Sequence, residues 1–68
     1  MATDTRVLDD RDVELLALLA RGLTQSGAGR RMSISGRTVR RQLDRICERL
    51  EVGTYIEAVV WAAKAGLL

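Results

Sequence analysis

Residues 35–50 of this 68-residue chain read SGRTVRRQLDRICERL, and this stretch decides the fold. Four apolar residues recur within it at the spacing of one helical face: Val39, Leu43, Ile46 and Leu50. They predict an apolar stripe that packs on a core. Arginines crowd the N-terminal half of the opposite face, and acidic residues begin only at Asp44. The stretch therefore predicts a long helix that is anchored on one side and basic on the other.

Two interpretations of this basic helix are open from its own residues. A helix that enters the DNA major groove end-on needs positive charge in its first turns, which meet base edges and phosphates. An amphipathic helix with a solvated, arginine-rich outer face would show the same pattern.

A shorter helix precedes the basic one. Residues 23–32 read as a short helix that is capped by Thr24, Ser33 and Ile34 form a tight connection, and Ser35 caps the next helix. A short helix, a turn and a longer basic helix make up a helix-turn-helix. This order favours the DNA-binding interpretation.

Two further helices flank this pair. The first is expected from about Asp10 to Arg21, with Asp9 as its cap and Asp12 as a capping-box acid, and Gly22 ends it. No strand pattern is found. The predicted fold is all-α, a compact four-helix bundle that contains the helix-turn-helix.

The last helix is expected from about Tyr55 to Lys64 or Ala65. Thr54 and Glu57 form its capping box, and Gly66 closes it. The terminal residues Leu67 and Leu68 are expected to fold back on the core.

Short fragments spread over nearly the whole chain match one known family. In order they are Arg21-Gly22-Leu23-Thr24, Ile34-Ser35, Thr38-Val39-Arg40, Ile46, Arg49-Leu50, Val52, Ala58-Val59 and Gly66-Leu67-Leu68. With these fragments the chain resembles the LuxR-type (GerE-like) helix-turn-helix DNA-binding domain of bacterial transcription regulators. The domain is expected over residues 8–68, after a polar and flexible N-terminal segment of residues 1–7.

The resemblance implies double-stranded DNA as a partner and assigns site residues. The base edges would be contacted by Arg40, Arg41 and Asp44. The DNA backbone would be contacted by Thr24, Gln25, Arg37, Thr38, Gln42 and Arg45. A homodimer would form through the C-terminal helix, with an interface of Tyr55, Val60, Trp61 and Lys64. Trp61 is the only tryptophan, and the alternative is that it caps the small core.

The chain departs from the family pattern at several positions. Gly27-Ala28-Gly29 stands where the family usually has Glu-Ile-Ala, Ser33 replaces the turn glycine, and Gln42 replaces the usual histidine. Because glycine disfavours helices, Gly29→Ala is expected to stabilise the domain by about 0.5–1 kcal/mol unless the site is tightly packed.

Composition excludes several classes of function. The formal charge is only +2, and the sequence holds no histidine and one cysteine, Cys47. A catalytic triad, a zinc site and an internal disulfide are therefore not expected. Neither an enzyme nor a cofactor or metal is predicted. No apolar run approaches the roughly twenty residues of a membrane span, so a cytoplasmic protein without membrane contact is expected.

The sequence thus favours a sequence-specific DNA-binding domain of a bacterial transcription regulator, with residues 35–50 as the recognition helix. One alternative is a helix-turn-helix that serves as a protein–protein interaction module. Another is the promoter-binding region of a sigma-like factor. Whether a receiver or ligand-sensing domain belongs to a longer parent protein is open from these residues.

Overall fold

Four helices make up the part of the chain that the structure describes. The computed structural model describes residues 7–68, so the predicted flexible segment 1–7 lies, except for Val7, outside the described residues. In chain order the helices are α1 (Asp10–Ala20), α2 (Gln25–Met32), α3 (Gly36–Leu50) and α4 (Tyr55–Lys64). No strand occurs between residues 7 and 68, and the predicted all-α fold of four helices is confirmed.

Each helix begins next to the residue that the sequence predicts as its cap. These caps are Asp9, Thr24, Ser35 and Thr54. In each, a side-chain oxygen accepts a hydrogen bond from the backbone N–H of the third helical residue, which has no acceptor within the helix. The predicted capping boxes of Asp12 and Glu57 are also present. Local side-chain chemistry therefore fixes where all four helices start.

The four helices also share one way of ending, the Schellman motif. A backbone N–H just beyond each helix donates to the carbonyl five residues earlier: Leu23 to Leu18, Ile34 to Gly29, Val52 to Cys47, and Leu67 to Ala62. The residue before each donor is left-handed, with φ of 100° at Gly22, 60° at Ser33, 58° at Glu51 and 79° at Gly66. Ser33 and Glu51 adopt this backbone conformation although they carry a Cβ, which costs L residues about 1–2 kcal/mol.

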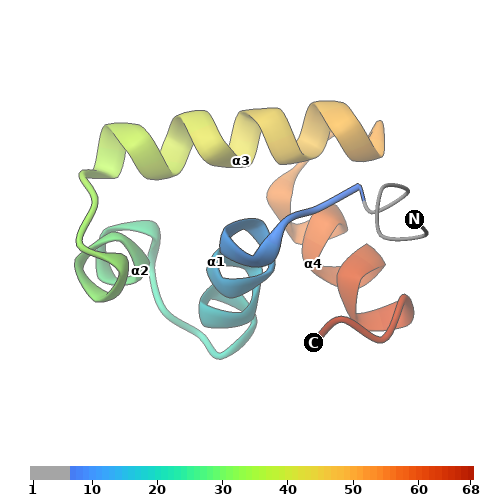
Figure 1. Ribbon diagram of the computed structural model, residues 1–68, viewed down its shortest axis with the longest axis horizontal. Helices are drawn as coiled ribbons and strands as arrows, with labels where there is room; N and C mark the ends of the chain where they lie inside the picture. Colours follow the sequence, from blue (N-terminus) through green and yellow to red (C-terminus); the bar gives the residue numbers. More distant parts are fainter. Residues whose placement is uncertain (1–6) are drawn as a thin grey trace.

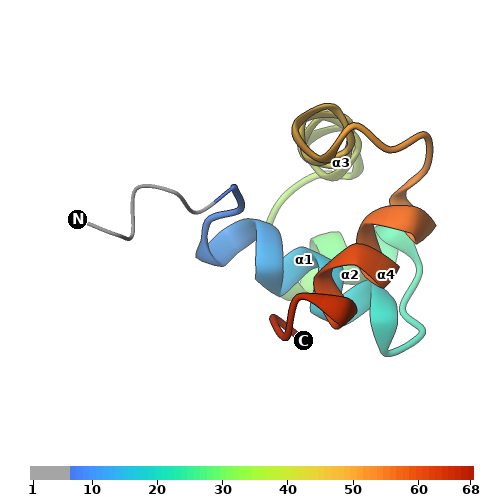
Figure 2. The same cartoon turned by 90° about the vertical axis from the view of Figure 1, so that its right-hand side faces the viewer.

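Helix α3 lies across one side of the other three helices (Figure 1). Seen end-on in Figure 2, α3 stands above α1, α2 and α4. The buried apolar side chains between them form one core: Leu8, Leu15, Leu16, Leu18, Ala28, Val39, Leu43, Ile46, Ala58 and Ala62. Three residues of the predicted α3 stripe belong to this core, and Leu50, the fourth, is half-buried against it. The stripe thus fixes which side of α3 faces outward.

Gly29 marks a close approach between α2 and the turn that leads to α3. A Cβ at this position would lie 2.9 Å from the carbonyl oxygen of Ile34 and 3.0 Å from Cγ2 of Val39. Both distances are too short for an ordinary contact, and the Ile34 oxygen belongs to the backbone. The site is therefore tightly packed, which is the exception that the expectation for Gly29→Ala allowed, so this substitution is not expected to stabilise the domain. Glycine at this position permits close packing of the helix-turn-helix.

The C-terminal leucines do not fold back on the core as expected. Leu67 and Leu68 are 38% and 43% exposed. The backbone N–H of Leu67 is held by the carbonyl of Ala62, so the chain closes α4 by a backbone hydrogen bond. The expectation that these side chains would join the core is wrong.

Candidate nucleic-acid interface

The outer face of α3 presents four exposed arginines, Arg37, Arg40, Arg41 and Arg45. All but one of the α3 residues predicted to contact DNA are exposed: Arg37, Thr38, Arg40, Arg41, Asp44 and Arg45. The exception is Gln42, which is only 6% exposed. These side chains are exposed, so the other described helices, which pack on the opposite side of α3 (Figure 2), do not cover this face.

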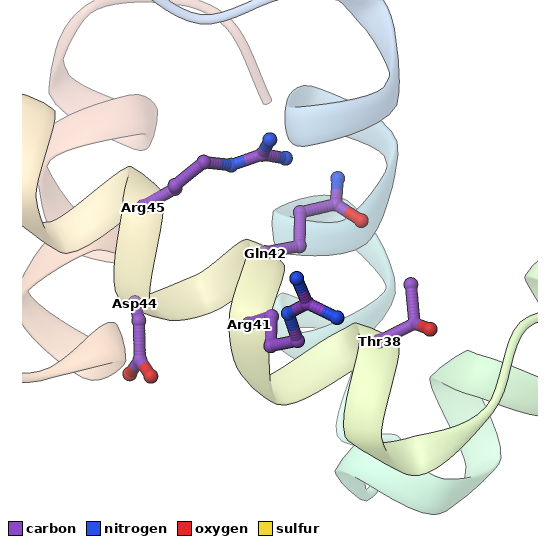
Figure 3. A pocket seen from close by; sticks show the side chains of 5 residues that line it. All are labelled: Thr38, Arg41, Gln42, Asp44 and Arg45. Carbon is purple, nitrogen blue, oxygen red and sulfur yellow. The ribbon is translucent and has the colours of Figure 1, made fainter.

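Hollows along α3 group these side chains. One hollow is lined by Thr38, Arg41, Gln42, Asp44 and Arg45 (Figure 3). A second joins the start of α2 to the first turns of α3 and is lined by Gln25, Ser26, Gly36, Arg37, Arg40 and Arg41. Residues from both helices of the helix-turn-helix therefore share one surface.

Electrostatics favour an anionic partner on this surface. Among the described residues, none of the guanidinium groups of Arg37, Arg40, Arg41 and Arg45 is paired with a carboxylate. Thr24 Oγ1 accepts the backbone N–H of Gly27 over 3.0 Å, and it caps none of the earlier N–H groups of α2. Those N–H groups, on Gln25 and Ser26, add partial positive charge to the surface. Unpaired guanidinium groups beside a helix N-terminus suit phosphate oxygens.

Thr38 has a structural role besides any contact with a partner. Its hydroxyl lies 3.0 Å from the hydroxyl of Ser35, and the Ser35 oxygen also accepts the Thr38 backbone N–H over 3.1 Å. Only one of the two hydroxyls can donate to the other. The second hydroxyl hydrogen is then free to donate to a phosphate at the start of α3.

Gln42 lies elsewhere than the sequence interpretation requires. Its amide Nε2 donates to Oδ1 of Asp12 over 3.1 Å, in a buried contact between α3 and α1. In Figure 3 the Gln42 side chain points toward α1, while Asp44 points away from it. Because the side chain is buried and its amide is engaged, this position does not support the predicted contact with the DNA backbone. The sequence gives no local signal for a partner thirty residues away.

The predicted dimer residues on α4 are only partly grouped by the structure. Val60 is 47% exposed, Trp61 is 36% exposed and Lys64 is also exposed, whereas Tyr55 packs half-buried against the core. Ile56, which the sequence interpretation did not single out, is 62% exposed. The four-residue spacing of Ile56 and Val60 is the signal that could have identified it, because residues four apart share a helix face.

Cys47, on α3, is half-buried and lines a hollow together with residues at the start of α4. Burial raises the pKa of its thiol, and the nearby carboxylates of Asp44 and Glu57 raise it further. The thiol is therefore kept protonated near neutral pH, which does not favour nucleophilic chemistry. Within residues 7–68 no cluster of three acidic, histidine or cysteine side chains could hold a metal ion.

Comparisons with known proteins agree with this arrangement. The sequence model of bacterial regulatory proteins of the luxR family (GerE) matches residues 6–62, which span α1, α2, α3 and most of α4. No curated protein and no solved structure matches the chain significantly. None of the helices in the described part of the chain is long and apolar enough to cross a membrane.

Proposed function

Because this chain belongs to the luxR family of bacterial regulatory proteins, whose helix-turn-helix domains bind DNA, we propose that it binds double-stranded DNA sequence-specifically through α3. The observation that carries the proposal is the set of exposed arginines on the outer face of α3, none of which is paired with a carboxylate of residues 7–68. An α-helix with its side chains is about 10–12 Å wide and fits the major groove of B-DNA, which is about 12 Å wide. The proposed domain spans residues 8–68.

Base reading is assigned to three residues in the middle of α3. Arg40 and Arg41 carry guanidinium groups that match the paired acceptors of guanine. Asp44 carries a carboxylate that repels phosphate but accepts from the amino group of cytosine. A preferred site that contains G·C pairs follows from this combination.

Contacts with the DNA backbone are assigned to residues at the edges of the same surface. They are Thr24, Gln25, Arg37, Thr38 and Arg45. These residues flank the base-reading positions on α2 and α3, so phosphates on either side of the groove would meet donors. Gln42, whose amide is bound to Asp12, is left out of this set.

We also propose that two copies pair through α4 on a roughly two-fold DNA site. Val60, Trp61 and Lys64 supply the exposed surface, and Ile56 extends it by one turn. Exposed tryptophan and branched aliphatic side chains on one helix are typical of an interface. Tyr55 contributes from its half-buried position at the start of α4.

The proposal is tested by selecting duplexes from a randomised pool with the intact chain. The best duplex and a scrambled duplex of the same composition are then titrated at two salt concentrations. Specific binding should survive salt that abolishes binding to the scrambled duplex, because non-specific binding rests almost entirely on counterion release. Arg41→Ala on α3 should lose the preference for the best duplex. Arg11→Ala, which removes an exposed arginine from α1, is its control for a simple loss of charge. If added salt weakened binding to both duplexes equally, the result would favour the protein-interaction module instead.

A further inference from the structure

One flank of α3 is held to the start of the domain by two polar contacts. Gln42 Nε2 donates to Oδ1 of Asp12 over 3.1 Å, and Arg49 donates to the backbone carbonyl of Val7, also over 3.1 Å. Positions 42 and 49 are two helical turns apart, so they lie on the same side of α3. Both acceptors lie at or just before the first turn of α1.

The acceptor on Asp12 is itself fixed in place. Its Oδ2 accepts the backbone N–H of Asp9 over 3.2 Å, and Oδ1 of Asp9 accepts the backbone N–H of Asp12 over 2.9 Å. The capping box of α1 therefore holds the carboxylate that Gln42 meets. Asp12 and Gln42 are 5% and 6% exposed, so water competes little for this contact.

An apolar stripe and a buried hydrogen bond constrain a helix differently. Contacts of Val39, Leu43 and Ile46 with the core are non-directional, so they tolerate a small rotation of α3 about its own axis. The hydrogen bond between Gln42 and Asp12 depends on direction and distance, so the same rotation would break it. Directional contacts of this kind select one helix orientation.

We propose that Gln42 is a positioning residue for DNA recognition, which through Asp12 sets the rotation of α3 and hence the direction of Arg41 and Arg45. Arg41 is the adjacent residue and Arg45 follows one turn later, and both line the same hollow as Gln42 (Figure 3). A rotation of α3 about its own axis would move both guanidinium groups perpendicular to that axis and so change which DNA atoms they reach. The inference rests on the proposed function, since it assumes that α3 reads DNA.

The test compares affinities for a selected duplex and for its scrambled counterpart. The variants are Gln42→Met, which keeps the side-chain length without a donor, Asp12→Ala, which removes the acceptor, and the double variant. Gly22→Ala is the stability control, because it strains the left-handed residue after α1 and leaves both the flank of α3 and α4 intact. All measurements are made well below the unfolding midpoint of each variant, as recorded by circular dichroism.

We expect the ratio of the two affinities to fall about tenfold for Gln42→Met and for Asp12→Ala, as for a lost bidentate base contact. The double variant should lose no more than either single variant, because both break one contact. The salt dependence on the scrambled duplex should stay unchanged, since no phosphate contact is removed. Gly22→Ala should keep the ratio of the parent chain.

Several outcomes would overturn the inference. An unchanged ratio in Gln42→Met would show that the contact serves stability alone. A loss in Gln42→Met with an unchanged ratio in Asp12→Ala would show that Gln42 contacts DNA directly. If Asp12→Ala does not fold, the comparison of Gln42→Met with the parent chain decides alone, and an unchanged ratio there contradicts the proposal. Failure of the parent chain to select any duplex would instead refute the proposed function.

Discussion

The backbone oxygen of Ile34 lies 2.9 Å from the point where a Cβ on Gly29 would sit, and Val39 Cγ2 lies 3.0 Å from that point. Gly29→Ala should therefore destabilise the domain by about 1–3 kcal/mol, because overpacking outweighs the gain in helix propensity. Urea unfolding measures the change. Gly36→Ala is the matched control, because its Cβ would meet no atom within 4 Å, and it should be neutral or slightly stabilising. A more stable Gly29→Ala would show that the turn relaxes at little cost.

At Ser33, just after α2, a substitution to glycine should stabilise the domain. Its φ of 60° is left-handed, and the same conformation is held by Gly22 at the end of α1. Ser33→Gly should raise the free energy of unfolding by about 0.5–1 kcal/mol, since relief of the Cβ strain exceeds the added entropy of the unfolded chain. Gly22→Ala should lower it by a similar amount. Thermal unfolding of both variants checks the pair, and a less stable Ser33→Gly would count against this explanation.

Cys47 should react slowly with alkylating reagents in the folded chain. Burial and the carboxylates of Asp44 and Glu57 raise the pKa of its thiol above the unperturbed 9.0, so the folded state favours the protonated form. The pH at which iodoacetamide labelling is half-maximal should lie higher for the folded chain than for the chain in urea. By linkage, this group's contribution to stability is complete below pH 9.0 and is lost as pH rises through the folded pKa. Equal labelling curves would contradict the raised pKa.

Arg41 and Arg45 should differ in how their loss affects DNA binding. Arg41→Ala should cost about 1–3 kcal/mol on the selected duplex and relax the base preference at one position, because Arg41 is assigned to a base edge. Arg45→Ala should weaken selected and scrambled duplexes alike and reduce the salt slope by about one, because Arg45 is assigned to phosphate. Both side chains are exposed, so neither change should affect folding. Identical behaviour of the two variants would refute the division of roles.

The local features of this fold could be predicted from the sequence, and the long-range ones could not. The caps at Asp9 and Thr54 are recognisable because each lies three residues before its carboxylate partner. The contact of Gln42 with Asp12 joins residues thirty positions apart, so no local pattern indicates it. The role of Gly29 likewise depends on where the Ile34 backbone lies after folding. Sequence periodicity placed the arginines of α3 outward, and tertiary contacts decided which neighbouring polar side chain turned inward.

The end of α3 likewise shows that the sequence does not identify which residue of a turn becomes left-handed. The sequence predicts the recognition helix over residues 35–50, and α3 ends at Leu50, before Glu51-Val52-Gly53. The left-handed residue is Glu51, with φ of 58°, and Gly53 does not adopt positive φ. Where α3 ends is set by the hydrogen bond from Val52 to Cys47, which fixes the position of the left-handed residue before it. The position of Gly53 alone would therefore place the left-handed residue two positions too late.

Truncation of exposed apolar side chains on α4 should weaken the pairing of two protein copies on DNA without unfolding the domain. Ile56 is 62% exposed, so Ile56→Ala should change the free energy of unfolding by less than about 1 kcal/mol. Trp61 is only 36% exposed and is otherwise covered by its own domain, so Trp61→Ala should cost more, about 1–3 kcal/mol, without unfolding the domain. Because both side chains belong to the proposed α4 interface, each variant should bind a single half-site normally and lose cooperative binding to a full two-fold site. Shift assays on full and half sites, with sedimentation of the free chain, measure both effects. Leu68→Ala is the control, since Leu68 is 43% exposed but lies beyond α4. Unfolding of Trp61→Ala would place Trp61 in the core, and cooperativity that survives both changes would mean that α4 does not pair the two copies.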